Sequence, residues 1–229
     1  MKLAIMQPYF MPYIGYFQLI KAVDKFVIYD DVNYINRGWI NRNNILVNGN
    51  EHLFSISLGK ASQNKLINEI SIIDDFKKFM RMIEMAYKKA PYFDAVYELL
   101  DEIINFTNRQ LAVFLQNSLL KISDYLRIET EFVLSSSIEK DNSLRGQEKI
   151  LEICKLLNAT TYINPIGGQS LYDKNSFKLE GIELYFIQPR FSQYKQFGSD
   201  FIGGLSIIDV MMFNSVEKVN EMLDNCQLI

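Results

Sequence analysis

Side chains of the kinds that bind and transform polar ligands are concentrated in one stretch, DDVNYINRGWINRN, from Asp30 to Asn43. Its fourteen positions hold two acids, two arginines, four asparagines, a tyrosine and a tryptophan. A loop that only connects two elements rarely needs this mixture, whereas bidentate donors beside a stacking ring suit a polar ligand. We therefore expect Arg42, with Asn41 beside it, to bind a phosphate or carboxylate group. Trp39 or Tyr34 would stack on a base or sugar.

Asp30 and Asp31 follow one predicted strand, and Gln7, which carries an amide, follows an earlier one. Residues 3–6 and 25–29 are short apolar runs without solvent-facing alternation, which is typical of parallel strands covered on both faces. A helical pattern lies between them, so the first thirty residues predict a strand-helix-strand unit. In an open α/β sheet, ligands bind outside the carboxyl ends of the strands. Gln7, Asp30 and Asp31 are expected at this edge.

Two later segments place polar groups in the same way. Ser136 lies in a serine run after the predicted strand TEFVL, and Gly167, Gly168 and Gln169 follow the predicted strand TTYIN. Two of these strand ends precede a helix start that could face an anion.

Simpler structural roles account for the same residue types. An acid after a strand often caps a turn, and serines often cap helices. A pair of glycines is a weak signal that also fits a flexible turn. Trp39, Tyr34 and Tyr194 would also be ordinary core aromatics.

The whole chain reads as a single α/β domain, residues 1–229, with a Rossmann-like, mostly parallel sheet. Strands and helices alternate at both ends, and two strands joined at NGN predict a hairpin after Asn43. From about residue 74 to residue 127 the pattern is helical throughout. We interpret this stretch as a helical insertion or subdomain.

Composition excludes several classes of protein. The net charge is −3 and no basic block exceeds a pair, which argues against nucleic-acid binding. His52 shares no metal-binding spacing with Cys154 or Cys226, so no metal site is predicted, and Cys154 fits a buried helix position. No apolar run has the length of a signal peptide or a membrane span. We expect a cytoplasmic protein without membrane insertion.

Several segments together resemble the WbqC-like family, which is associated with bacterial O-antigen and other surface-polysaccharide gene clusters. They are QPYFMPYIGYFQLI, DKFVIYDDVNYINRGWINRN, AYKKAPYF, LRIETEFVLSSS, EICKLLNATTYIN, YKQFG and LSIIDVMMFN, so the likeness covers nearly the whole chain. The positions that match the family pattern are Gln7, Pro8, Gly15, Tyr16, Asp30, Tyr34, Asn41, Arg42, Ser136, Tyr194, Gln196 and Asp209. The resemblance implies a role in surface-glycan biosynthesis.

The opening also resembles, more distantly, the nucleotidyltransferase superfamily. That superfamily starts its first helix at a His-x-Gly-His motif, and here the corresponding residues read PYIGYF. Gly15 remains, but both histidines that stabilise charge on the transferring phosphate are missing. The likeness therefore implies that this chain has the fold of the superfamily but lacks the groups that its nucleotidyl transfer needs.

Three functions remain open at this point. The preferred one is an acyl- or aminoacyltransferase that modifies the amino group of a nucleotide-linked sugar, with a thioester donor, possibly on a carrier protein, and no required cofactor. Asp30 would accept the proton of the amine, and Gln7 or backbone groups near Gly167 would stabilise the oxyanion. The second is a degenerate nucleotidyltransferase acting on a sugar phosphate, with Mg²⁺ held by Asp30 and Asp31. The third is a non-catalytic protein that binds a nucleotide sugar.

Overall fold

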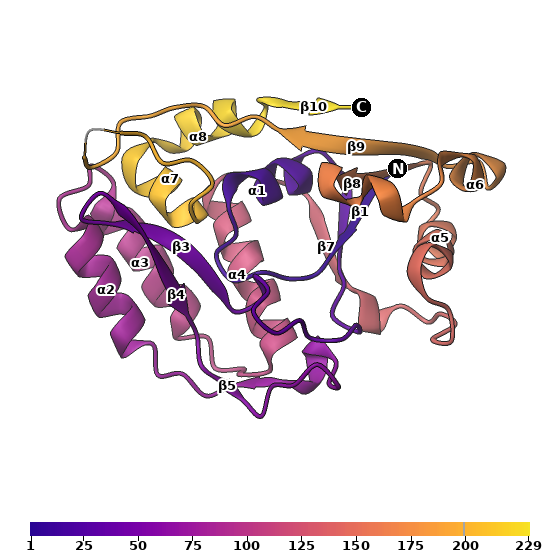
Figure 1. Cartoon of the computed structure of the whole chain (residues 1–229), viewed down its shortest axis with the longest axis horizontal. Helices are drawn as coiled ribbons and strands as arrows, with labels where there is room; N and C mark the ends of the chain where they lie inside the picture. Colours follow the sequence, from indigo (N-terminus) through magenta and orange to yellow (C-terminus); the bar gives the residue numbers. More distant parts are fainter. Residues whose placement is uncertain (199) are drawn as a thin grey trace.

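A six-stranded sheet forms the centre of the computed structural model, which describes residues 1–198 and 200–229 (Figure 1). In spatial order its strands are β10 (Cys226–Leu228), β9 (Glu183–Pro189), β8 (Thr161–Pro165), β1 (Lys2–Met6), β2 (Lys25–Ile28) and β7 (Glu131–Leu134). Only β10 runs antiparallel to its neighbour, β9, and the other neighbours are parallel. The prediction of an α/β fold with a mostly parallel sheet is confirmed.

The strand order gives the sheet a topological switch point between β1 and β8. The chain runs from β1 outward through β2 to β7, and then returns to the other side of β1 with β8 and β9. Residues Leu3 to Met6 of β1 pair in parallel with Lys25 to Ile28 of β2. Helix α1 (Ile14–Lys21) connects these two strands, as the sequence predicts.

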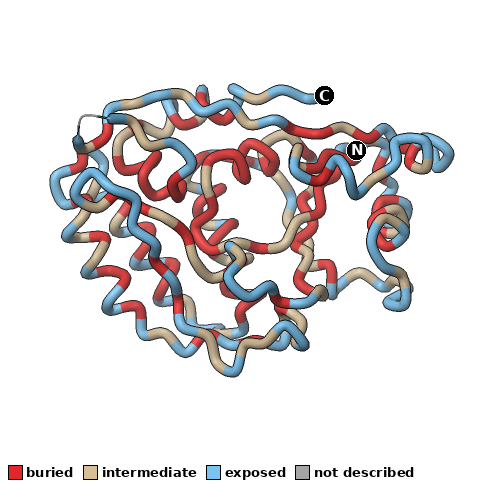
Figure 2. The backbone as a smooth tube through the Cα atoms, viewed as in Figure 1, coloured by how far each residue is buried: buried red, intermediate tan, exposed pale blue. Residues whose placement is uncertain are grey.

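Helices cover both faces of the sheet, which explains why its strands lack polar alternation. Leu3, Ile5 and Val27 point to the face covered by α5 (Gly146–Leu156) and α6 (Lys174–Leu179). Ala4 and Phe26 point to the opposite face, which is covered by helices including α1 and α8 (Val216–Leu223). Figure 2 shows the buried backbone concentrated in this sheet and in the helices next to it.

The connection from β2 to β7 is long and carries most of the remaining elements. It contains a hairpin of β3 (Arg42–Val47) and β4 (Asn50–Ser55), the short strands β5 (Leu58–Gly59) and β6 (Ser71–Ile72), the 3-10 helix η1 (Ile67–Glu69), and helices α2 (Lys77–Tyr87), α3 (Phe93–Ile104) and α4 (Leu111–Tyr125). Asn48 and Gly49 turn the hairpin with φ angles of 51° and 76°, the left-handed region that a two-residue hairpin turn requires. The hairpin and the helices lie where the sequence predicts them. The interpretation of residues 74–127 as a helical insertion or subdomain stays a prediction.

Three further elements complete the described chain: the 3-10 helices η2 (Ser135–Ser137) and η3 (Ile166–Leu171), and helix α7 (Ile207–Phe213). Within the described ranges, no helix has the length and apolar character needed to cross a membrane.

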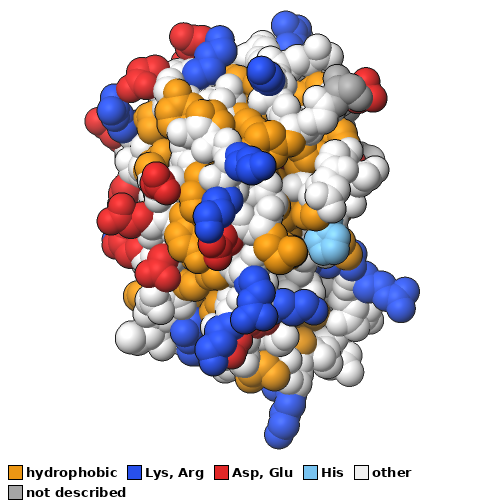
Figure 3. Space-filling model, turned by 90° about the vertical axis from the view of Figure 1, so that its left-hand side faces the viewer, with side chains coloured by type: hydrophobic (Ala, Val, Ile, Leu, Met, Phe, Trp, Pro, Cys, Tyr) orange, Lys and Arg blue, Asp and Glu red, His pale blue; other side chains and the backbone are white. Residues whose placement is uncertain are grey.

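The face on the left of Figure 1, with α2 and α3, is drawn in Figure 3. Acidic side chains gather along one edge of this face, and the single histidine, His52, lies at its surface. Cys154 is fully buried, and burial raises the pKa of its thiol to about 12. The burial of Cys154 agrees with the buried helix position that the sequence predicts.

Candidate functional site: a cationic cavity at the sheet edge

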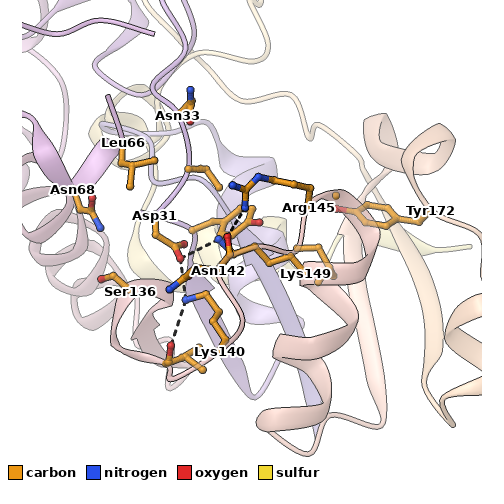
Figure 4. Close-up of a pocket in the computed structure, with 15 residues that line it drawn as sticks. Asp31, Asn33, Leu66, Asn68, Ser136, Lys140, Asn142, Arg145, Lys149 and Tyr172 are labelled. Atoms are coloured by element: carbon orange, nitrogen blue, oxygen red, sulfur yellow. Dashed lines mark hydrogen bonds and ion pairs between the residues drawn. The ribbon is translucent and has the colours of Figure 1, made fainter. Parts of the chain in front are cut away.

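A cavity of about 690 Å³ lies at the carboxyl ends of β2 and β7 (Figure 4). Asp31 and its neighbours follow β2, Ser136 and Lys140 follow β7, and Tyr172 comes from the segment after β8 and η3. The lining residues are Tyr29, Asp31, Val32, Asn33, Leu66, Asn68, Ser136, Ile138, Lys140, Asn142, Arg145, Gly146, Lys149, Ile150 and Tyr172. Segments distant in the sequence therefore meet where the fold class predicts a ligand.

Two buried lysines share one carboxylate in the wall of this cavity. Asp31 Oδ2 lies 2.9 Å from Lys140 Nζ and 3.1 Å from Lys149 Nζ. The side chains of the two lysines are 1% and 5% exposed, so both charges are largely removed from water. Burial by itself would raise the pKa of Asp31, but the hydrogen bonds from Lys140, Ser135 and Lys149 outweigh it and the pKa is lowered. Asp31 is therefore held as a carboxylate.

The lysines are fixed by further contacts. Lys140 Nζ also donates to the backbone carbonyl oxygens of Ser135 and Ile138. Lys149 Nζ lies 5.3 Å from the centre of the Tyr29 ring, a cation–π distance. Ordered ammonium groups lose little conformational entropy when they bind an anion, which makes the site preorganised.

The cavity carries a net positive charge. Lys140, Lys149 and Arg145 line it, and Asp31 is the only acid among its lining residues. Arg145 is exposed, and Figure 4 shows it beside the cavity. Three cations against one carboxylate favour an anionic ligand.

The amino end of helix α5 adds to this charge. Gly146, the first residue of the helix, lines the cavity, and the N-cap residue Arg145 makes no side-chain capping hydrogen bond. The first backbone N–H groups of a helix lack intrahelical partners, and the helix dipole is positive at this end. Helix starts of this kind bind phosphate and carboxylate groups.

Asp30, the predicted proton acceptor, lies behind the cavity wall and is 1% exposed. Its Oδ1 accepts a hydrogen bond from the Ser136 backbone N–H at 2.9 Å. Its Oδ2 accepts from the Ser136 hydroxyl at 2.6 Å and from Asn68 Nδ2 at 3.3 Å. Asp30 therefore ties the end of β2 to the start of η2, and it contacts the cavity through Ser136 and Asn68, both of which line it. Its role as a base stays a prediction.

The polar residues between Tyr34 and Arg42 mostly bond to one another. The Tyr34 hydroxyl donates to Asn41 Oδ1 at 2.8 Å, and Asn41 Nδ2 donates to the Ile56 carbonyl oxygen. Arg42 donates from Nε to the Gly38 carbonyl oxygen at 2.8 Å and from a terminal nitrogen to that of Arg37. These contacts hold the loop together, and none of the three residues lines the cationic cavity. Trp39 lines a second, smaller cavity.

The candidates near β1 have packing partners. The Tyr16 hydroxyl donates to the Gln7 carbonyl oxygen at 2.8 Å, and the Tyr16 ring packs on Phe26. A Cβ atom at Gly15 would lie 2.3 Å from the Tyr13 ring and 2.9 Å from Pro189 Cγ, so this glycine leaves room for both at the start of α1. Gln7 follows β1 at the carboxyl edge but is not part of the cationic cavity's lining.

The glycines after β8 lie in η3, with Gly167 and Gln169 exposed and Gly168 buried. None of the three lines the cationic cavity, although Tyr172, shortly after them, does.

Tyr194 and Gln196 belong to a separate buried network around Asp209. Asp209 is 0% exposed, and its Oδ1 accepts hydrogen bonds from the Tyr194 hydroxyl and from Gln196 Nε2, both at 2.6 Å. Its Oδ2 accepts from the Tyr87 hydroxyl at 2.8 Å. Burial raises the pKa of Asp209 despite these donors. The network joins α2, α7 and the segment before α7.

Lys140, Arg145 and Lys149 are site residues that the sequence pattern does not single out. In the sequence Arg145 and Lys149 look like ordinary charges at a solvated helix start, SLRGQEK, and Lys140 looks like a loop charge in the preceding IEKDN. The available signal was a helix start after a predicted strand, which could face an anion.

The residues do not fit the magnesium ion of the nucleotidyltransferase alternative. Asp30 is buried and hydrogen-bonded at both oxygens, and the ammonium groups of two lysines already pair with Asp31 Oδ2, so a second cation there would be repelled. Across residues 1–198 and 200–229, no group of three or more His, Cys, Asp or Glu side chains is placed to hold a metal.

Comparisons with known proteins agree with the resemblance noted in the sequence. The chain is 29% identical over 231 residues to the uncharacterized protein Rv1507c of Mycobacterium tuberculosis, and the alignment covers 99% of both chains. No solved structure gives a significant match. The family model described as "WbqC-like protein family" matches residues 7–221. Because this match spans almost the whole chain, including both sides of the cationic cavity, the chain belongs to the WbqC-like protein family.

Proposed function

We propose that this protein is a transferase of surface-glycan biosynthesis that binds a nucleotide-linked amino sugar by its phosphates in the cationic cavity. The observation that carries the proposal is the pair of buried lysines on Asp31, next to Arg145 and the uncapped start of α5. A volume of about 690 Å³ lies within the range of small-molecule sites, roughly 300–1,000 Å³.

Asp31 keeps this cationic site compatible with folding. Two buried ammonium groups without a counter-ion would be costly, so the carboxylate offsets part of their charge in the free protein. A diphosphate brings further negative charge. The positive charge that Asp31 leaves uncompensated attracts it. The site therefore distinguishes a phosphorylated ligand from a neutral sugar.

The reaction we assign is transfer of an acyl or aminoacyl group from a thioester, possibly on a carrier protein. The sugar amine attacks the thioester carbonyl, a C–N bond forms, the C–S bond breaks, and the thiolate leaves. One proton passes from the amine to a base and then to the thiolate. No enzyme nucleophile or cofactor is needed.

Ser136 gives that proton a route to Asp30. Its side chain lines the cavity and its hydroxyl already donates to Asp30 Oδ2 at 2.6 Å. As Ser136 Oγ accepts a proton from the amine, it passes its own proton to Asp30. Ser136 then touches the substrate, and Asp30 acts behind it.

The phosphate assignment is tested by isothermal titration calorimetry with nucleotide-linked amino sugars and with pyrophosphate. A charge-assisted hydrogen bond contributes about 1.5–3 kcal/mol, so Arg145→Gln and Lys149→Met should each weaken binding roughly 10- to 150-fold. Arg81→Gln, which changes an exposed arginine of α2, is the matched control and should bind normally. Unchanged affinity in both cavity variants would overturn the phosphate assignment.

The transfer is tested by mass spectrometry of mixtures that contain acyl thioesters and amino-sugar nucleotides. Ser136→Ala keeps the backbone hydrogen bond to Asp30, so it should fold and bind normally while turnover falls about 10²- to 10⁴-fold, the usual contribution of proton transfer. If no mixture yields an amide product while the nucleotide sugar still binds, the transferase proposal is wrong and a non-catalytic binding protein is favoured.

A further inference from the structure

A second cavity, of about 250 Å³, opens among aromatic side chains at another part of the sheet edge. Tyr9 and Tyr13 follow β1, Trp39 belongs to the loop after β2, and Phe191 follows β9. Asn43 and Gly204 complete the lining. We call it the aromatic cavity.

The chemistry of the aromatic cavity differs from that of the cationic cavity. None of its lining residues is charged, and four of them are aromatic. The Asn43 side chain already donates to the Met11 carbonyl oxygen and accepts from the Asn44 N–H, so its amide is occupied. Ring stacking is therefore the main interaction that this cavity offers to a ligand.

Its aromatic walls are open to solvent but held in place. Trp39 is 45% exposed and Phe191 is 48% exposed, unlike the rings of the core. The Arg42 guanidinium lies 5.7 Å from the centre of the Trp39 ring and is anchored to the loop's own carbonyl oxygens. The rings of Tyr13 and Phe191 are 6.1 Å apart. Stacking surfaces that are fixed before binding lose little entropy when a ring enters.

One loop connects the two cavities. Asp31, Val32 and Asn33 line the cationic cavity, and Trp39 and Asn43, a few residues later, line the aromatic cavity. In the sheet, β1 lies between β2 on one side and β8 and β9 on the other. Both cavities are therefore lined by segments that follow strands on both sides of the switch point, the place where open α/β sheets bind nucleotides.

We propose that the aromatic cavity binds the nucleobase of the ligand whose phosphates bind in the cationic cavity. This inference rests on the proposed function and extends it, since it assigns the uncharged ring of the ligand to a separate subsite. A base is planar and neutral, and stacking on a protein aromatic ring contributes about 1–3 kcal/mol per base. The sugar is left near the cationic cavity, close to Ser136.

The chain contains a single tryptophan, Trp39, so intrinsic fluorescence reports on this cavity directly. Trp39 fluorescence, excited at the red edge of the tryptophan absorption band, is recorded in four separate titrations. The added compounds are uridine, adenosine, a neutral hexose and inorganic pyrophosphate. We expect saturable quenching by at least one nucleoside, little change with the hexose or pyrophosphate, and tighter quenching by the matching nucleotide sugar.

Phe191→Ala removes an exposed wall of the cavity and should weaken nucleoside binding about 5- to 150-fold, which is the stacking contribution expressed as a ratio. Tyr92→Ala, at an exposed aromatic residue before α3, is the matched control and should leave the titration unchanged. Absence of saturable quenching by any nucleoside, or saturable quenching by the hexose alone, overturns the nucleobase assignment.

Arg145→Gln separates this inference from the proposed function. It should weaken binding of the nucleotide sugar and leave the nucleoside titration unchanged, because only the nucleotide sugar carries phosphates. If nucleotide-sugar binding depends on Arg145 but never perturbs Trp39, the aromatic subsite is wrong and the phosphate site stands. If nucleosides quench Trp39 while neither Arg145→Gln nor Lys149→Met weakens binding of the nucleotide sugar, the subsite stands and the phosphate site is wrong.

Discussion

Several residues of types associated with chemistry make contacts that maintain the backbone. Asp30 bonds to Ser136 and Asn68, and Tyr34 bonds to Asn41. Asp31, the immediate neighbour of Asp30, is the acid that faces the cationic cavity. Successive residues at the end of a strand point in different directions, so adjacent side chains of one type take different roles.

The two glycines of η3 show how differently neighbouring positions respond to the same change. A Cβ atom at Gly168 would lie 2.0 Å from Asn164 Nδ2, whereas one at Gly167 would meet nothing within 4 Å. Asn164 is buried and its side chain bonds to Tyr162 and to the Pro165 carbonyl oxygen. Gly168 is therefore required by packing, and Gly167 is not.

We expect Gly168→Ala to lower the free energy of unfolding by about 1–3 kcal/mol, because Asn164 must move and its hydrogen bonds weaken. Gly167→Ala should leave stability within about 1 kcal/mol of the wild type or raise it slightly. Urea unfolding of both variants measures the difference. Equal losses in the two variants would contradict this account of the Gly168 contact.

At the scale of elements, a single buried carboxylate connects parts that are distant in the chain. The Tyr87 hydroxyl of α2 accepts a hydrogen bond from the Leu46 N–H of β3 and donates to Asp209 of α7. Tyr194 and Gln196 attach the segment after β9 to the same carboxylate. Asp209 therefore fixes how the hairpin, α2 and α7 pack, although it is remote from the cationic cavity in the chain and in its contacts.

Asp209 should make stability depend on pH. Its pKa is raised in the folded protein, mainly by burial, so the folded state holds the proton more tightly than the unfolded state. This contribution is fully present below the unfolded pKa, about 3.9, and is lost as pH rises through the folded pKa, at about 1.4 kcal/mol per unit of pKa difference. The stability of the wild type relative to Asp209→Asn should therefore fall as pH rises above about 4.

Urea unfolding at a series of pH values measures this difference. Asp124→Asn, at an exposed acid near the end of α4, serves as the control and should track the wild type across the series. A difference between wild type and Asp209→Asn that stays constant or grows with pH would contradict the assigned direction of the pKa shift.

At the scale of the whole molecule, the helices inserted between β2 and β7 share their core with the sheet. One cluster of buried apolar residues extends from Phe26 in β2 to Ile83 in α2 and Leu115 in α4. A shared core couples the unfolding of the parts that it joins. The helical region at residues 74–127 should therefore unfold together with the sheet.

Ile83→Ala tests this coupling, because Ile83 is 0% exposed and a cavity there should cost about 2–5 kcal/mol. We expect the midpoint of unfolding to fall equally when it is followed by circular dichroism, which reports the helices, and by Trp39 fluorescence, which reports the loop after β2. Met85→Ala, at a residue 82% exposed, should change neither midpoint. A fall in the circular dichroism midpoint alone would show that the helical region is an independent subdomain.

The sequence by itself determined the parts of this protein that depend on local pattern. Apolar runs without alternation predict covered parallel strands, the NGN turn predicts the hairpin, and amphipathic spacing predicts α2, α3 and α4. Motifs spread along the chain also identified the family. These features are local or additive along the chain, so they can be recognised without knowing which segments meet.

The tertiary structure alone decided which polar residues share a cavity. Lys140 and Lys149 look like surface charges until β7 and α5 place them on Asp31, more than a hundred residues earlier in the chain. Arg42 looks like an anion ligand until the loop closes and its guanidinium donates to carbonyl oxygens of that loop. Burial and charge pairing are properties of distances between segments, and a list of residue types does not contain those distances.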